Sequence, residues 1–329
     1  MLVTTVSHAQ LVAEVRSRRA VWDLREPELG AASGSLPEHP PVKADRVTPF
    51  PAGPVEVFTD RVAAASLVAA GALFAATRDL ARAASLLLVG VPPAARLGRE
   101  AFAATLARHL AGMGVVPMDP GAFRRLDRIS AILIDDQLLR GVLAGHGTWL
   151  SATAAHLVGD PIQPDLLQPP ATAGMVLFPA GIPGVSSGVE PLPAGETILD
   201  AVGRLQAAGH GVLLLAGSDN NALAAADVAI AIDHPDQPVG WAADLLCRPQ
   251  PAPVITLLNA VPAARRVSRR SVTIAAVGSA AATALTTLSP LPYTDLTMQP
   301  VYLSGLLAQW QAAQSASTLA RNAAHHPAS

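Results

Sequence analysis

Long apolar runs alternate with polar stretches along this chain of 329 residues. Uncharged runs cover residues 62–76, 83–95, 272–293 and, less regularly, 296–310. Four arginines between positions 265 and 270 precede the third run. A helix needs about 20 apolar residues to cross a bilayer, and basic residues mark the cytoplasmic end of such helices. We therefore expect membrane helices within 62–78, 83–98 and 265–312.

Between the second and third runs, the apolar segments become short. Four of them predict buried strands, at residues 131–134, 175–178, 212–215 and 228–232. Helical periodicity at 198–208 and 221–226 separates the later ones. Short buried strands that alternate with helices are typical of parallel sheets. The sequence therefore predicts an α/β fold with a Rossmann-like parallel sheet, combined with hydrophobic α-helices.

The remaining polar patterns divide the chain into segments. Apolar positions at helical spacing predict an amphipathic N-terminal helix, and a run of prolines follows it as an extended linker. The expected segments are the helix at 1–29, the linker at 30–55, a helical hairpin and stalk at 56–125, an α/β domain at 126–264, hydrophobic helices at 265–312 and a flexible tail at 313–329.

Composition narrows the class of protein. Half the residues are hydrophobic and the mean hydropathy is +0.36, which permits a membrane protein. The net charge of −2 gives no reason to expect a nucleic-acid partner. Lys43 is the only lysine, so a catalytic lysine elsewhere is excluded. The lone Cys247 cannot form an internal disulfide, which fits a reducing compartment. Residues 1–19 lack the pattern of a secretory signal.

One candidate for chemistry is Asp135, which directly follows the apolar segment Ile132–Ile134. Ligands of α/β sheets bind beyond the carboxyl ends of the strands. A carboxylate placed there could attack a phosphoryl group, with Mg²⁺ offsetting the charge. Taken alone, the same pattern also fits a carboxylate that caps a turn.

Five segments together resemble the P-type ATPase family. Leu126–Asp136 resembles the strand that ends in the phosphorylated aspartate, and Ala216–Ile232 resembles the Gly-Asp-Gly-x-Asn-Asp loop that holds magnesium. Ser85–Pro93 is similar to the fourth membrane helix, which a proline breaks at the cation site. Gly114–Arg128 and Val267–Arg270 resemble the stalk and the entry to the fifth span. The resemblance implies a haloacid-dehalogenase-like phosphorylation domain.

The residues that this family uses around the phosphorylated aspartate are largely replaced. Asp135 stands at the phosphorylation position, but Asp136 and Gln137 stand where the family has lysine and threonine. A second carboxylate beside the nucleophile repels an incoming phosphate. Ile198 stands near the position of the family's phosphate-steadying lysine.

The magnesium loop and the broken helix also depart from the family. One alignment of the loop places Gly217 and Asn221 on the two magnesium aspartates. A second, without a gap, places Leu215 and Asp219 there, so Asp135 and Asp219 are the remaining metal candidates. At the ion pathway, the segment of Val91, Pro92 and Pro93 supplies no side-chain ligand.

These departures predict a degenerate, truncated pump relative that is catalytically inactive and needs no resident cofactor. The 82 positions from Asp135 to Gly217 are too few for the family's nucleotide-binding insertion. We expect the inner or plasma membrane with a cytoplasmic α/β domain, and a regulatory or structural role beside a full-length P-type ATPase or another membrane protein.

Two alternatives stay open. One is a small Mg²⁺-dependent phosphatase of the haloacid dehalogenase superfamily, with Asp135 as the nucleophile and Asp219 as a metal ligand. The other is a structural membrane module without a catalytic role. A soluble cytoplasmic location is the alternative to the membrane.

Overall fold

The computed structural model describes most of the chain as two compact units. The described residues are 2–33, 42–46, 48–80, 83–84, 87, 93–136, 138, 147–159, 173–233, 237–288 and 295–324. The helical unit comprises Met1–Val12, Ala52–Thr105 and Ala264–Ala316, and the sheet unit comprises Ala13–Pro51, Leu106–Ala263 and Ser317–Ser329.

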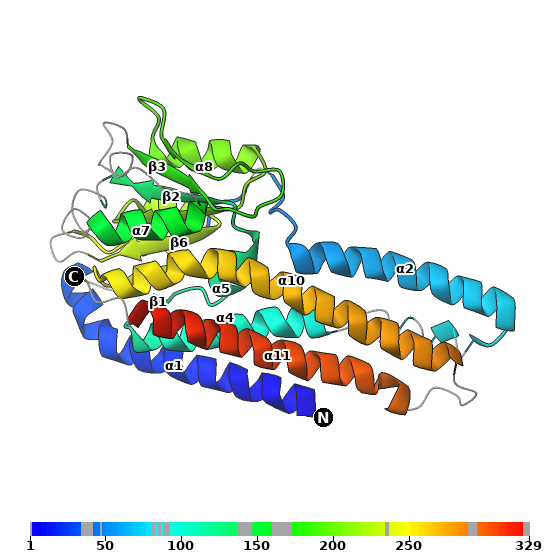
Figure 1. Ribbon diagram of the computed structural model, residues 1–329. Coiled ribbons are helices and arrows are strands. Elements are labelled where there is room, and N and C mark those ends of the chain that lie inside the picture. Colours follow the sequence, from blue (N-terminus) through cyan, green and yellow to red (C-terminus); the bar gives the residue numbers. More distant parts are fainter. Residues whose placement is uncertain are drawn as a thin grey trace. The chain divides into compact units, whose positions relative to one another are not determined.

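Among the described residues, the sheet unit has seven strands in the order β1-β7-β6-β5-β2-β3-β4. They are β1 Val116–Pro117, β2 Ala131–Asp135, β3 Gly174–Phe178, β4 Gly188–Pro191, β5 Val212–Ala216, β6 Val228–Ile232 and β7 Leu245–Cys247. Figure 1 labels β2, β3 and β6 of this sheet. Strands β2, β5, β6 and β7 run parallel, which confirms the predicted parallel sheet. Strands β3, β4 and β1 join by antiparallel pairs, and antiparallel edge strands are common on such sheets.

Short helices connect these strands. They are α5 Ala122–Arg125, the 3-10 helix η1 Leu126–Arg128, α7 Gly147–Val158, α8 Ile198–Ala207 and α9 Asn220–Ala225. Helices α8 and α9 fall where the hydrophobic periodicity predicts them. Every residue of β5 and β6 is buried, and Leu133, Val202 and Leu214 belong to one apolar core. The continuous apolar runs of these strands follow from cover on both faces.

Five longer helices complete the fold: α1 Leu2–Ser33, α2 Pro54–Thr77, α4 Ala94–Gly112, α10 Pro251–Leu288 and α11 Asp295–Ala324. Helix α1 extends beyond the predicted end at residue 29, so the extended segment begins later than expected. The flexible tail predicted from residue 313 is wrong through position 324. Its first part continues α11, because Ala316 and Ala320 are buried.

Small residues, chiefly alanine, make up most of the interior of the helical unit. Ala94, Ala275 and Ala308 pack in one buried cluster, whereas Leu303 and Trp310 are 61% and 63% exposed. Large apolar side chains are normally the buried ones in water. Small residues inside and large apolar residues outside are the arrangement of helix bundles in membranes.

Helix α2 is long and apolar enough to cross a membrane, by length and composition. Over its best 18-residue window the mean hydropathy is 1.5, and 6% of that window is buried. It contains the predicted run 62–76. Among the described helices, α2 alone meets this criterion, so the spans predicted in α10 and α11 are not supported by it. The run 83–95 lies mostly outside the described residues.

Two helical glycines test the packing of the helical unit. A Cβ at Gly278 of α10 would lie 2.5 Å from Ser304 Oγ and 3.1 Å from the carbonyl oxygen of Pro300, both on α11. A Cβ at Gly71 of α2 would meet nothing within 4 Å. We expect Gly278→Ala to lower the free energy of unfolding by about 1–3 kcal/mol through overpacking. Gly71→Ala should leave it unchanged or raise it by up to about 1 kcal/mol, since alanine favours helix.

Thermal and denaturant unfolding of the purified full chain measures both variants. Equal effects of the two substitutions would contradict close packing between α10 and α11.

Candidate functional site

Asp135 is the last residue of β2, at the carboxyl edge of the parallel strands. Ile134 of β2 is in register with Leu215 of β5, so the two strands end side by side. Gly217 and Ser218 follow the end of β5 directly, and α9 begins at Asn220. The structure therefore brings Asp135 and the predicted magnesium loop to one edge of the sheet. Asp135 is 8% exposed there.

The carboxylate of Asp219 acts as a helix cap. Its Oδ1 accepts hydrogen bonds from the backbone amides of Asn221 and Ala222, both at 3.1 Å. Capping aspartates satisfy amides at a helix N-terminus that have no partner within the helix. Asp219 therefore has a structural function at the start of α9, whether or not it also binds a metal.

The position of the first magnesium aspartate is covered by a neighbouring loop. A Cβ at Gly217 would lie 3.0 Å from Gln237 Oε1, and a Cβ at Gly240 would lie 2.7 Å from the Gly217 carbonyl oxygen. Asn220 Oδ1 accepts a hydrogen bond of 3.0 Å from the amide of Ala242. The loop after β6 therefore packs against the backbone of Gly217, and a side chain at position 217 would require Gln237 to move.

An apolar side chain lies beside the strand end that carries Asp135. Gly174 of β3 is in register with Asp135, and a Cβ at Gly174 would lie 3.0 Å from Ile198 Cδ1. Ile198 is the first residue of α8 and is 8% exposed. The side chain at the position of the expected phosphate-steadying cation is therefore near the site, but it carries no charge. Sequence reasoning missed the requirement for glycine at 174.

The remaining predicted positions lie in or beside described elements, or outside the described residues. Asp136 is half-buried and its amide donates to the Ala173 carbonyl oxygen at 3.0 Å. Asn221 is exposed on α9. Gln137, Val91 and Pro92 lie outside the described residues, and Pro93 forms the turn before α4. No group of three or more His, Cys, Asp or Glu side chains within the described ranges could hold a metal.

The single lysine is engaged at the opposite edge of the sheet. Lys43 Nζ donates to Asp244 Oδ2 and to the Leu223 carbonyl oxygen, both at 3.0 Å. Asp244 directly precedes β7, so it lies at the amino ends of the parallel strands. Lys43 therefore does not replace the missing lysine beside Asp135.

A buried arginine, Arg25 of α1, is the feature of the carboxyl edge that sequence reasoning missed. Arg25 is 2% exposed, donates to the Gly114 carbonyl oxygen at 2.6 Å, and pairs with Asp233, which directly follows β6. Burial raises the pKa of Asp233, and the charge of Arg25 opposes that shift. The pair is 208 positions apart in sequence, so no local pattern could reveal it. It fastens α1 to the sheet unit.

The cap of α9 gives a prediction that separates its structural role from metal binding. Asp219→Ala should lower the free energy of unfolding by about 1 kcal/mol, because the two amides lose their acceptor. Asp219→Asn keeps a good capping residue and should cost only a few tenths of that amount. We expect Mg²⁺ to leave the thermal unfolding of the wild type and of both variants unchanged.

A stabilisation by Mg²⁺ that Asp219→Asn abolishes would contradict this assignment. It would identify Asp219 as a metal ligand.

Comparison with known proteins places this arrangement in a family. No protein-family model matches the chain. The chain is 32% identical over 307 residues to "Probable cation-transporting ATPase I" of Mycobacterium tuberculosis (strain CDC 1551 / Oshkosh), and 31% identical over 306 residues to the protein of that name from Mycobacterium leprae (strain TN). Each alignment covers 69% of this chain and 19% of the relative. The chain thus spans about a fifth of the length of these relatives.

A solved structure of a zinc-transporting PIB-type ATPase in the E2.Pi state is also similar, with a TM-score of 0.37 and 13% identity. It covers 82% of this chain and 62% of that one, in a superposition too loose to transfer residue positions. The mycobacterial sequences are sufficient by themselves: the chain is related to the P-type cation-transporting ATPases.

Proposed function

We propose that this chain is a membrane-associated relative of cation pumps whose phosphoryl-transfer site no longer catalyses turnover. The observation that carries the proposal is the carboxyl edge of the sheet. Asp135 stands at the strand end, while an isoleucine, a second aspartate and a glycine stand where the family resemblance expects two cations and a magnesium ligand. The nucleophile position is retained without the groups that would activate it.

The charges at this edge of the sheet favour an inactive phosphoryl-transfer site. Phosphoryl transfer depends on positive charge that offsets the charge of the transferred group. Removing one such group commonly costs about 10²–10³ in rate. Ile198 supplies no charge, and the buried Arg25 already donates to Gly114 and pairs with Asp233. When several of these charged groups are absent together, the rate of phosphoryl transfer falls too far to be useful, even though the individual effects are not additive.

The interval between the two halves of the site supports the absence of a nucleotide-binding insertion. Helices α7 and α8 and strands β3 and β4 divide the chain between Asp135 and Gly217 into short pieces. The longest stretch between two of these elements, 159–173, has 15 residues. A domain needs at least about 50 residues, so none fits there.

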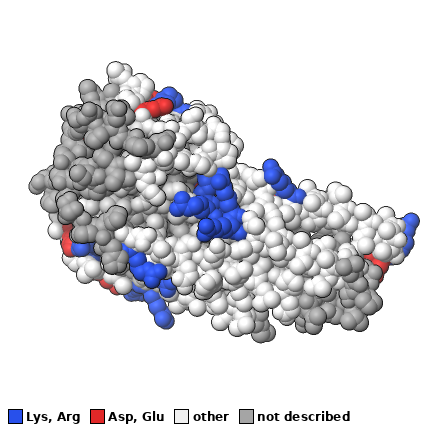
Figure 2. All heavy atoms as spheres, in the orientation of Figure 1, with Lys and Arg blue, Asp and Glu red and all other residues white. Residues whose placement is uncertain are grey.

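The helical unit supports the membrane part of the proposal. Most of its buried residues are alanine, serine or threonine, large apolar residues such as Leu303 and Trp310 are exposed, and α2 has the length and composition of a span. Figure 2 shows basic side chains gathered over the middle of α10, which carries four arginines between positions 265 and 270. Basic residues at the end of an apolar helix favour the cytoplasmic side, which would place the sheet unit in the cytoplasm.

An exposed apolar face on α11 supports the partner part of the proposal. Leu303, Leu307 and Trp310 of α11 are at least half exposed. Their spacing of four and three residues places them on one face of the helix. Such a face contacts either lipid or another membrane helix. We propose a regulatory or structural association with a full-length pump through this face.

One experiment tests location and turnover together. Membranes from cells that express the tagged full chain are washed at alkaline pH, and the purified protein is assayed for Mg²⁺-dependent phosphate release from ATP and from a small phosphate ester. We expect the chain to remain in the washed membranes and to release phosphate no faster than Asp135→Asn.

Mg²⁺-dependent release that Asp135→Asn abolishes would contradict the proposal and favour an aspartate-dependent phosphatase. Recovery of the chain in the alkaline wash would contradict membrane insertion. Copurification with a full-length pump from the washed membranes would support the regulatory role.

A further inference from the structure

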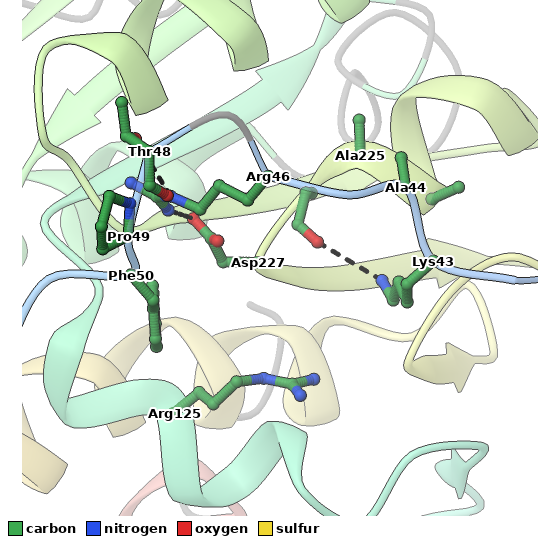
Figure 3. A pocket seen from close by; sticks show the side chains of 11 residues that line it. Lys43, Ala44, Arg46, Thr48, Pro49, Phe50, Arg125, Ala225 and Asp227 are labelled. Carbon is green, nitrogen blue, oxygen red and sulfur yellow. Dashed lines mark hydrogen bonds and ion pairs between the residues drawn. The ribbon is translucent and has the colours of Figure 1, made fainter.

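A cavity of about 500 Å³ lies in the sheet unit, away from Asp135. Its walls come from an extended segment (residues 42–46 and 48–51), from Arg125 of α5, and from Ala224–Asp227 between α9 and β6 (Figure 3). Asp227 directly precedes β6 and Arg125 lies shortly before β2. The cavity is therefore at the amino edge of the parallel strands, whereas Asp135 is at the carboxyl edge.

The charged side chains in the wall are mostly basic. Lys43, Arg46 and Arg125 line the cavity together with one carboxylate, that of Asp227. Arg46 Nη1 lies 2.5 Å from Asp227 Oδ2, and Arg46 Nη2 donates to the His210 carbonyl oxygen at 2.8 Å. These contacts, with those of Lys43 to Asp244 and Leu223, hold two cations in fixed positions. Each of the two cations is paired with one carboxylate, which partly offsets its charge, but a ligand does not have to order either side chain on binding.

Arg125 differs from the other two cations in its hydrogen bonding. Its Nη2 lies 2.8 Å from Asp119 Oδ2 and 3.2 Å from Asp244 Oδ1, but these contacts lack hydrogen-bond geometry. Its Nε also has no hydrogen-bond acceptor. The side chain is 31% exposed, and Figure 3 shows it reaching below Lys43 and Asp227. Nη2 and Nε are both buried, so a ligand with several acceptor oxygens reaches them only if the guanidinium turns away from Asp119 and Asp244.

The rest of the wall limits the kind of ligand. Pro49, Phe50 and Ala224–Ala226 provide apolar surface. The Phe50 ring is already contacted by the guanidinium groups of Arg46 and Arg128, at 5.5 Å and 5.3 Å from its centroid. An engaged ring is a poor platform for a nucleobase, so the cavity suits a compact anion with a short apolar part.

We propose that this cavity binds a phosphate ester of a small molecule, with Arg125 as the main contact to the phosphate oxygens and Lys43 and Arg46 as fixed neighbouring charges. The same chemistry occurs in soluble phosphorylated metabolites and in phospholipid headgroups. The site is independent of the phosphoryl-transfer edge and holds whether or not Asp135 is active.

Titration calorimetry on the purified full chain tests the proposal with glycerol 3-phosphate and inorganic phosphate as probes. We expect saturable binding that Arg125→Gln weakens at least tenfold, because a charge-assisted contact is lost. The matched control is Arg204→Gln, which removes an exposed cation paired with Glu196 on α8, outside the cavity. Its affinity should stay within about twofold of the wild type.

A second variant tests the proposal independently if Arg125→Gln does not fold. Ala225→Leu keeps all charges and narrows the cavity, and it should also weaken binding. Equal affinity in the wild type and in both variants, or no binding of either probe, would overturn the proposal. A further arm uses vesicles of phosphatidylcholine with and without phosphatidic acid. Binding that requires phosphatidic acid identifies a headgroup as the source, and binding of glycerol 3-phosphate alone identifies a soluble ester.

Discussion

The parallel pairing of β2 with β5 determines what can happen at the carboxyl edge of the sheet. It aligns Ile134 with Leu215, so the chain leaves both strands at one place. Both strands are buried from end to end, and their burial supplies the free energy that keeps the register. Asp135 and the loop at 217–221 are therefore brought together by apolar residues that take no part in any chemistry.

The residues that hold this edge together are not the residues at its reactive positions. The structure of the edge can therefore persist after its activity is lost. Glycine at 174 is required by the packing of β3 against β2, whereas Gly217 and Ile198 stand at positions where the family resemblance expects a magnesium ligand and a cation. Asp219 has a capping role that would preserve it without any metal. A fold persists when its core persists, and function depends on a few residues placed on it. The relationship to cation pumps describes the scaffold, and the inactive edge is our proposal.

The sequence predicted the interior of the sheet unit better than its edges. The four central apolar segments and the helices α8 and α9 were predicted because burial and periodicity leave a local signal. The pairing of Arg25 with Asp233 and the cavity beneath Lys43 join distant parts of the chain, and no local pattern reveals them. The end of α11 was predicted as a flexible tail because its alanines and polar residues give a weak apolar pattern, although Ala316 and Ala320 are buried.

In the helical unit, the apolar runs at 62–76, 272–288 and 296–310 lie in helices as predicted, but they did not show which residues face inward. Alanine is the most frequent buried residue there, although Phe102, Val267 and Val301 are buried too, and many of the large apolar residues that dominate a hydropathy pattern lie outside. The opposite is true of the sheet unit, where leucine, isoleucine and valine form the core. The two units therefore follow different rules of burial within one chain, and this difference supports a membrane environment for the helical unit.

The most direct test of the account asks whether Asp135 can still hold a phosphoryl group. Beryllium fluoride forms a stable phosphoryl mimic on an active aspartate in the presence of Mg²⁺, and fluorine NMR detects the bound species. We predict no bound fluorine signal for the full chain, and spectra identical to those of Asp135→Asn. A stoichiometric, Mg²⁺-dependent signal that disappears in Asp135→Asn would show a working site and contradict the central claim.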